Sequence, residues 1–143
     1  MRINQISVFV ENKPGRLAKI TGVLAEGNID IRAFSMADTT DFGIMRMIVN
    51  DPDKAIALLK AQGLTVSKTN VLAARLPDSP GALHRVLAVL SDAQVNVEYA
   101  YAFLTKEKND AFVILRVEEI EKAGAILAAA GIFTLSAEEV YGL

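Results

Sequence analysis

The strongest constraint on the fold of this chain is an internal repeat. The segment Asn12–Leu17 (NKPGRL) returns 66 residues later as Asp78–Leu83 (DSPGAL). The same offset relates Ile-Asp-Ile at 29–31 to Val-Asn-Val at 95–97. Because the motifs recur in phase, we predict that the chain is two copies of one folding unit.

The repeat changes its offset at one place. Beyond a loop it becomes 68, so that 43–49 matches 111–117. The two additional residues fall in 105–110, which is rich in Lys and Asp and predicts a hairpin turn. An insertion in a turn is what duplication followed by divergence leaves. We therefore predict two domains, 1–69 and 70–143.

Each copy has the residue pattern of a β-α-β-β-α-β unit. Apolar residues alternate in strand-like segments and recur every three or four positions in helix-like ones. Asp51 followed by Pro52 predicts the start of the second helix, and Asn28 is a plausible end of the first. The elements predicted in the first copy span 3–10, 17–24, 29–37, 43–49, 52–62 and 64–68.

This element order predicts an α+β, ferredoxin-like unit in which two helices cover one face of a four-stranded antiparallel sheet. No Gly/Ser-rich linker separates the copies near Thr69-Asn70, so the last strand of one runs into the first strand of the other. We therefore expect the two units to lie side by side, with their first helices adjacent. They would form one antiparallel eight-stranded sheet with four helices on one face.

Composition excludes several classes of protein. The chain has no cysteine, which removes disulfides and thiolate metal sites and favours a cytoplasmic location. A net charge of −2 counts against nucleic-acid binding, because phosphates require a basic surface. The sequence has neither an apolar run of the ~20 residues that a membrane helix needs nor a secretory signal at its start.

The combination of a strand, Asn/Asp-x-Pro-Gly-x-Leu, an amphipathic helix and Ile-Asp-Ile or Val-Asn-Val resembles the ACT domain family in both copies. The resemblance implies a non-catalytic regulatory protein without a cofactor, which binds a small amino acid at the seam between two units. It implies that the Pro-Gly turn, an amide before it and an amide at the start of the second strand hold the ligand. The physics agrees, because a helix N-terminus attracts a carboxylate.

Carried over by position, the residue before the turn is Asn12 in the first copy and Asp78 in the second. The second-strand residue is Asp30 in the first copy and Asn96 in the second. The family favours Asn at this last position, so Asp30 departs from its pattern. The alternative is that the Pro-Gly segments are only turns and that Asn12 and Asp78 are only helix caps.

If each site joins the turn of one copy to the second strand of the other, Asn12 meets Asn96 and Asp78 meets Asp30. Two carboxylates repel each other and a ligand carboxylate. We therefore expect one productive site, with Asn12, Lys13, Pro14, Gly15, Arg16, Leu17 and Asn96. The degenerate site has Asp30, Asp78, Gly81, Ala82 and Leu83.

Two other functions are compatible with parts of the sequence. The chain could be a regulatory subunit of a separate amino-acid biosynthetic enzyme, similar to the small subunits of acetolactate synthase. It could be a nucleic-acid-binding module that stacks bases on Tyr99, Tyr101 and Phe103. However, these aromatic residues share parity with Val95 and Val97, which predicts core packing. His84, the only histidine, predicts neither a catalytic base nor a metal site.

Parity also predicts an apolar face of the sheet, pointing away from the helices. This face is too apolar to remain in water, so we expect a second copy to cover it in a homodimer. The residues assigned to it are Phe34, Met36, Ile44, Ile48, Ala100, Ala102, Phe112 and Ile114.

Overall fold

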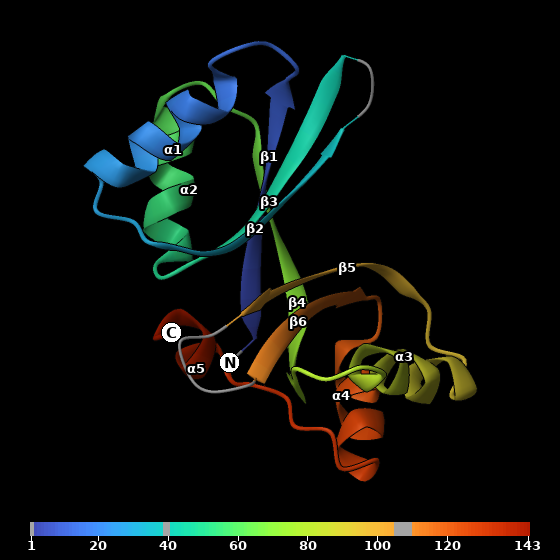
Figure 1. Cartoon of the computed structure of the whole chain (residues 1–143). Coiled ribbons are helices and arrows are strands. Elements are labelled where there is room, and N and C mark those ends of the chain that lie inside the picture. Colours follow the sequence, from blue (N-terminus) through green and yellow to red (C-terminus); the bar gives the residue numbers. More distant parts are fainter. Residues whose placement is uncertain (1, 39–40, 105–109) are drawn as a thin grey trace. The chain divides into compact units, whose positions relative to one another are not determined.

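The computed structural model describes residues 2–38, 41–104 and 110–143 (Figure 1). The chain divides into two compact units, one built mainly from Asn4–Thr69 and the other mainly from Asn70–Tyr141. We call them the N-terminal unit and the C-terminal unit, and describe each by itself. Most of the hairpin turn predicted at 105–110, and the turn tip at 39–40, lie outside the described residues.

The N-terminal unit has the predicted order of elements. It consists of β1 (Ile3–Glu11), α1 (Arg16–Glu26), β2 (Ile31–Asp38), β3 (Phe42–Val49), α2 (Pro52–Ala61) and the start of β4 (Val66–Pro77). Both β1 and β2 pair with β3 in antiparallel fashion. The apolar sides of α1 and α2 pack on the sheet in a core that includes Ile20, Leu24 and Leu59.

Local chemistry explains where the helices of this unit begin and end. The Asp51 side chain accepts a hydrogen bond from the backbone N–H of Lys54 (3.2 Å), and Pro52 occupies the first turn of α2. This is the predicted cap. Asn28, just beyond α1, has a positive φ of 58°, as expected of an Asn that ends a helix.

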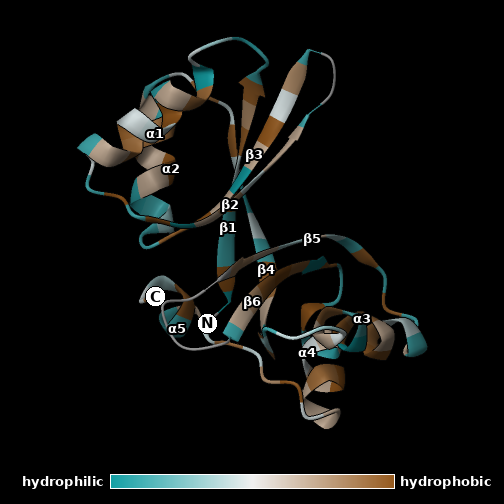
Figure 2. Cartoon of the chain, in the orientation of Figure 1, coloured by the Kyte–Doolittle hydropathy of each residue, from teal (hydrophilic) through white to brown (hydrophobic). Residues whose placement is uncertain are grey.

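The C-terminal unit repeats the arrangement. It contains β4 from Asn70 onward, α3 (Ala82–Asp92), β5 (Val97–Leu104), β6 (Asp110–Val117), α4 (Ile120–Ala129) and a short α5 (Ala137–Tyr141). Both β4 and β5 pair antiparallel to β6. Figure 2 shows hydrophobic residues along β6 and α4, which meet in a core that includes Val86, Leu90, Leu115 and Leu127.

The prediction of eight strands and four helices is wrong in its counts: the described residues form six strands and five helices. Two expected strands, the last of the first copy and the first of the second, are one continuous strand, β4. The last strand of the second copy is reduced to an isolated bridge between Ala74 and Thr134. The expected side-by-side placement of the units stays a prediction.

The fifth helix, α5, is held by a capping box. The Ser136 backbone N–H donates to Glu139 Oε1 (3.2 Å), and the Glu139 N–H donates to Ser136 Oγ (3.2 Å). Its buried residues, Ala137 and Val140, lie outside the core that α3 and α4 share. In Figure 1, α5 lies away from both of these helices. This short helix is additional to the four predicted helices.

A register shift changes which side chains of β2 face the helices. The shift lies between Ile31 and Ala33, and beyond it Phe34 pairs with Met47 and Met36 with Met45. Residues paired across antiparallel strands share a face, and both methionines of β3 belong to the helix-covered core. Phe34 and Met36 therefore lie on the helix side of the sheet, not on the opposite face as predicted.

The same shift occurs in β5, between Val97 and Tyr99. Ala100 and Ala102 now pair with Leu115 and Val113 of the helix-covered core, so their predicted face is also wrong. The strand's three aromatic residues lie on the other face, opposite Arg116, Ile114 and Phe112. The predicted packing of Tyr99, Tyr101 and Phe103 against the helices is therefore wrong.

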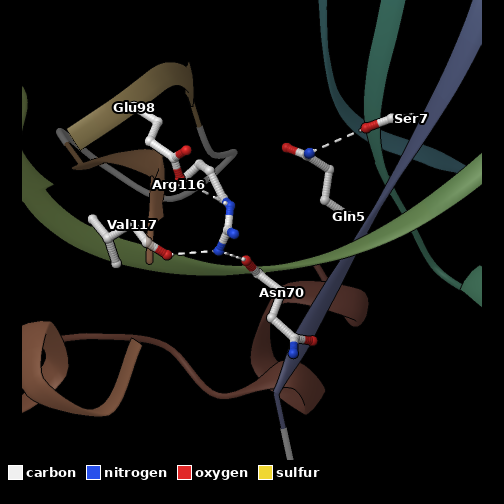
Figure 3. Close-up of polar contacts among 6 residues, drawn as sticks. All are labelled: Gln5, Ser7, Asn70, Glu98, Arg116 and Val117. Atoms are coloured by element: carbon white, nitrogen blue, oxygen red, sulfur yellow. Dashed lines mark hydrogen bonds and ion pairs between the residues drawn. The ribbon is translucent and has the colours of Figure 1, made fainter. Parts of the chain in front are cut away.

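On that face of the C-terminal unit, Arg116 joins several strands (Figure 3). Its guanidinium donates to the carbonyl of Asn70 (3.3 Å) in β4 and to the carbonyl of Val117 (2.6 Å), and pairs with Glu98 (3.3 Å) of β5. The side chain is only 26% exposed, so these contacts offset the cost of burying its charge. In the N-terminal unit, the buried Gln5 side chain donates to Ser7 Oγ (3.4 Å).

Candidate functional site

The two Pro-Gly turns have the same backbone geometry. Gly15 is the N-cap of α1 with φ 84° and ψ −8°, and Gly81 is the N-cap of α3 with φ 88° and ψ −10°. A Cβ at either position would meet no atom within 4 Å, so there is space for a side chain. Glycine is favoured here because of the positive φ. The turns therefore present the first N–H groups of each helix in the same way.

The residues before the turns are not helix caps. The caps are Gly15 and Gly81, and Asn12 and Asp78 lie three residues earlier, with exposed side chains. The alternative interpretation of Asn12 and Asp78 as caps is therefore wrong. Their exposure leaves them accessible to a ligand.

The two turns differ in charge. Glu11, at the end of β1, pairs with Lys13 (Nζ–Oε2 3.0 Å) and lies 4.0 Å from the Arg16 guanidinium. The corresponding positions of the second copy hold Pro77, Ser79 and Ala82, none of which is charged. The N-terminal turn therefore carries cations at positions 13 and 16 beside a helix N-terminus, which favours a carboxylate ligand, whereas the corresponding turn positions of the second copy carry none.

The ion pair at this turn has a measurable consequence. The hydrogen bond from Lys13, together with the charges of Lys13 and Arg16, lowers the pKa of the Glu11 carboxyl below its ordinary value of 4.5. A depressed pKa stabilises the fold above the unfolded pKa, and this contribution is lost as the pH falls through the folded pKa. NMR titration of Glu11 should show the lowered value. Lys13→Gln should return it toward 4.5, whereas the control Lys19→Gln should leave it unchanged. A wild-type pKa at or above 4.5 would contradict this ion pair.

The two second-strand positions have different surroundings. Asp30 is exposed and pairs with Arg32 (2.5 Å), and its backbone N–H donates to Asn50 Oδ1 (2.9 Å). Asn96 is also exposed, and it lines two small cavities of about 190 and 390 Å³, the first of them shared with Glu98 and Lys122. The Asp30 carboxylate is therefore already paired with Arg32 of β2, whereas the Asn96 side chain borders open cavities.

In the C-terminal unit, the cavity at the turn is a different one from the two cavities that Asn96 lines. Pro80, Gly81 and Ala82 line a cavity that does not include Asn96. The predicted pairs, Asn12 with Asn96 and Asp78 with Asp30, join residues of different units, and they stay predictions. Leu17 and Leu83, at the same position of each copy, are 42% and 44% exposed beside their turns.

The described part of the chain shows no cluster with the composition of a metal site. His84 is exposed on α3. Among residues 2–38, 41–104 and 110–143, no group of three His, Cys, Asp or Glu side chains is placed to hold a metal ion. None of the helices described is long and apolar enough to span a membrane.

Comparison with known proteins shows which families and structures are similar to this chain. Residues 1–140 match the model of the ACT domain pair family. No curated protein matches the chain. Protein BT0572 from Bacteroides thetaiotaomicron is 41% identical and has a TM-score of 0.93, over 100% of this chain and 98% of that one.

More distant structures share the fold. The regulatory subunit of aspartate kinase from Thermus thermophilus, in its ligand-free form, is 18% identical with a TM-score of 0.70, over 92% of each chain. The α and β subunits of an aspartokinase give 16% identity and a TM-score of 0.64, over 91% of this chain and 93% of that one. Together with the duplicated strand-turn-helix motif, the family match shows that this chain belongs to the family of ACT domain pairs.

Proposed function

We propose that this chain is a non-catalytic regulatory protein that binds a small amino acid at its N-terminal Pro-Gly turn. The observation that carries the proposal is the juxtaposition, at this turn, of an exposed Asn12, the exposed N-terminus of α1 and the cations Lys13 and Arg16. Helix N–H groups and cations bind the carboxylate of an amino acid. The Asn amide both donates and accepts, as a zwitterion requires.

The second site is proposed to be degenerate. Its turn lacks cations at the positions of Lys13 and Arg16, and it begins with the carboxylate of Asp78. Its expected partner, Asp30, is paired with Arg32. The second turn therefore offers a zwitterionic amino acid a carboxylate in place of the Asn12 amide and no cation at these two positions, so we expect one amino acid per chain.

The regulated activity is proposed to belong to another protein. The structural relatives include the regulatory subunit of aspartate kinase from Thermus thermophilus. A separate amino-acid biosynthetic enzyme is therefore the proposed partner, which the ligand would switch through this chain.

A homodimer is also proposed, through the exposed apolar residues of β2, which lie on the helix side of the sheet and not on the face that the sequence predicted. Ile48, Phe112 and Ile114 are buried, whereas Phe34 is 61% and Met36 is 37% exposed on β2. Light scattering at micromolar concentration tests whether a second copy is bound.

Nucleic-acid binding is the second candidate, because the structure removes one argument against it. The aromatic residues of β5 lie on the face that is free of α3 and α4. However, Phe103 packs on Phe112 with ring centroids 5.4 Å apart, and the net charge is −2. Retention on heparin or RNA at moderate salt would favour this candidate.

A thermal-shift screen against the twenty amino acids tests the proposed function directly. A ligand that binds only the folded state stabilises it by about 2.7 kcal/mol at a concentration of about 100 times its Kd. We expect one amino acid, or a few of similar size, to raise the unfolding midpoint, and calorimetry to give one ligand per chain. No shift with any amino acid at millimolar concentration would contradict the proposal.

A further inference from the structure

The first helix of each unit borders a cavity, at the place where its first turns approach the residues after the second helix. The N-terminal cavity has a volume of about 220 Å³ and is lined in part by Ile20 and Gly63. The C-terminal cavity has a volume of about 470 Å³ and is lined in part by Val86 and Gly131. These residues correspond through the repeat offsets of 66 and 68, so the two cavities occupy the same place in the two copies.

The C-terminal cavity combines apolar walls with cations. Leu76, Val86 and Ile132 form its apolar part, and Phe133 at its edge is 76% exposed. A volume of 470 Å³ is within the range of about 300–1,000 Å³ found for small-molecule sites, whereas the N-terminal cavity is smaller.

Arg85 is held at this cavity by the protein itself. Its Nη2 donates to the carbonyl of Ala130 (2.7 Å), at the C-terminal end of α4. This bond directs the side chain from α3 across to α4. A guanidinium has five N–H donors, and only one bond is needed to hold it there, so it can also bind a carboxylate.

The second cation, Arg75, is neutralised. Its Nε donates to Asp110 Oδ2 (2.8 Å), and the same carboxylate oxygen is contacted by its Nη2. Arg75 therefore contributes shape and little net charge, which leaves Arg85 as the cation that a ligand would meet.

The corresponding cavity of the first copy has different chemistry. It is lined by the carboxylate of Glu11, whose position is held by Pro77 in the second copy. It has Lys19 at the position of Arg85, and an ammonium cannot bind a carboxylate in the planar, two-pronged way that a guanidinium does. Only the C-terminal cavity therefore has a guanidinium without a carboxylate side chain in its lining.

We propose that the C-terminal cavity, which Pro80, Gly81 and Ala82 of the second turn also line, is a binding site for a small amphipathic carboxylic acid, distinct from the amino-acid site at the N-terminal turn. Its carboxylate pairs with Arg85, and an aromatic or branched apolar group packs on Leu76, Val86 and Ile132. A free amino acid is disfavoured because no acidic side chain lines the cavity to accept its ammonium group.

The probe for this site is 3-phenylpropionate, titrated into the full chain and followed by calorimetry and by amide NMR. Amide shifts should concentrate at 81–86 and 131–133. The neutral analogue 3-phenyl-1-propanol should bind about tenfold more weakly, because it lacks the charge that Arg85 recognises. Equal binding of the alcohol, or no binding of the acid at millimolar concentration, would overturn the proposal.

Variants locate the binding. Arg85→Gln should weaken binding of the acid about tenfold. Phe133→Glu changes an exposed position and should weaken binding of the acid by charge repulsion, so it tests the site even if Arg85→Gln impairs folding. The matched control in the first copy, Lys19→Gln, should change nothing, and Asn12→Ala should leave the acid bound while it tests the amino-acid site. Unchanged affinity in both cavity variants, or loss of affinity in Lys19→Gln, would show that the acid binds elsewhere.

Discussion

Replacing Asn12 with alanine is expected to weaken amino-acid binding by about 10- to 100-fold, because a hydrogen bond to a charged ligand contributes roughly 1.5–3 kcal/mol. The side chain is exposed and is not a helix cap, so its removal should not unfold the chain. Asn96→Ala should have the same effect if both amides bind one ligand. Calorimetry with the amino acid found by thermal shift measures both variants.

Asp78→Ala is the matched control, because Asp78 occupies the position of Asn12 in the other copy and is equally exposed. It should leave the affinity nearly unchanged. Loss of binding in Asp78→Ala with normal binding in Asn12→Ala would place the productive site at the other turn. Two equivalent ligands per chain would show that neither turn is degenerate.

Ile114→Ala is expected to lower the free energy of unfolding by about 2–5 kcal/mol, the range for truncating a buried large aliphatic side chain. Ile114 is 0% exposed in β6, on the face of the C-terminal unit that carries Tyr101. Chemical denaturation followed by circular dichroism measures the loss.

The control for this prediction is Phe34→Ala. Sequence parity placed Phe34 and Ile114 on one apolar face, but Phe34 is 61% exposed, so its truncation should cost less than about 1 kcal/mol. If Phe34→Ala also lowers the dimer fraction in light scattering, the exposed ring belongs to the proposed dimer surface. Equal destabilisation by both variants would contradict the burial of Ile114 and the exposure of Phe34.

The repeat and the local chemistry of the turns were readable in the residues. Pro-Gly twice in phase predicted two identical strand-turn-helix junctions, and both glycines have the positive φ of a left-handed N-cap. Asp51 followed by Pro52 predicted the start of α2, which the side-chain cap of Asp51 confirms. The Ser136–Glu139 capping box is a sequence signature of α5 as well.

The faces of β2 and β5 could not be predicted by counting residues. Alternation assigns faces only while every residue of a strand is paired, and the register shifts at 31–33 and 97–99 break that condition. Beyond each shift, the side chains lie on the face opposite to the one that alternation predicts. Phe34 therefore lies on the helix side of its sheet, and Tyr101 lies on the face away from the helices. The sequence carries the same apolar residues with or without the shift.

The sequence by itself therefore determined the ACT unit, its duplication and its Pro-Gly turns, because these depend on interactions between residues that are neighbours along the chain. Tertiary structure alone decided that two expected strands are one strand, β4, that the last expected strand is a single bridge at Thr134, and that Arg85 reaches the end of α4. Each of these depends on hydrogen bonds between residues far apart in the sequence. Periodicity reports how one segment buries its own side chains, and it does not report which distant backbone that segment pairs with.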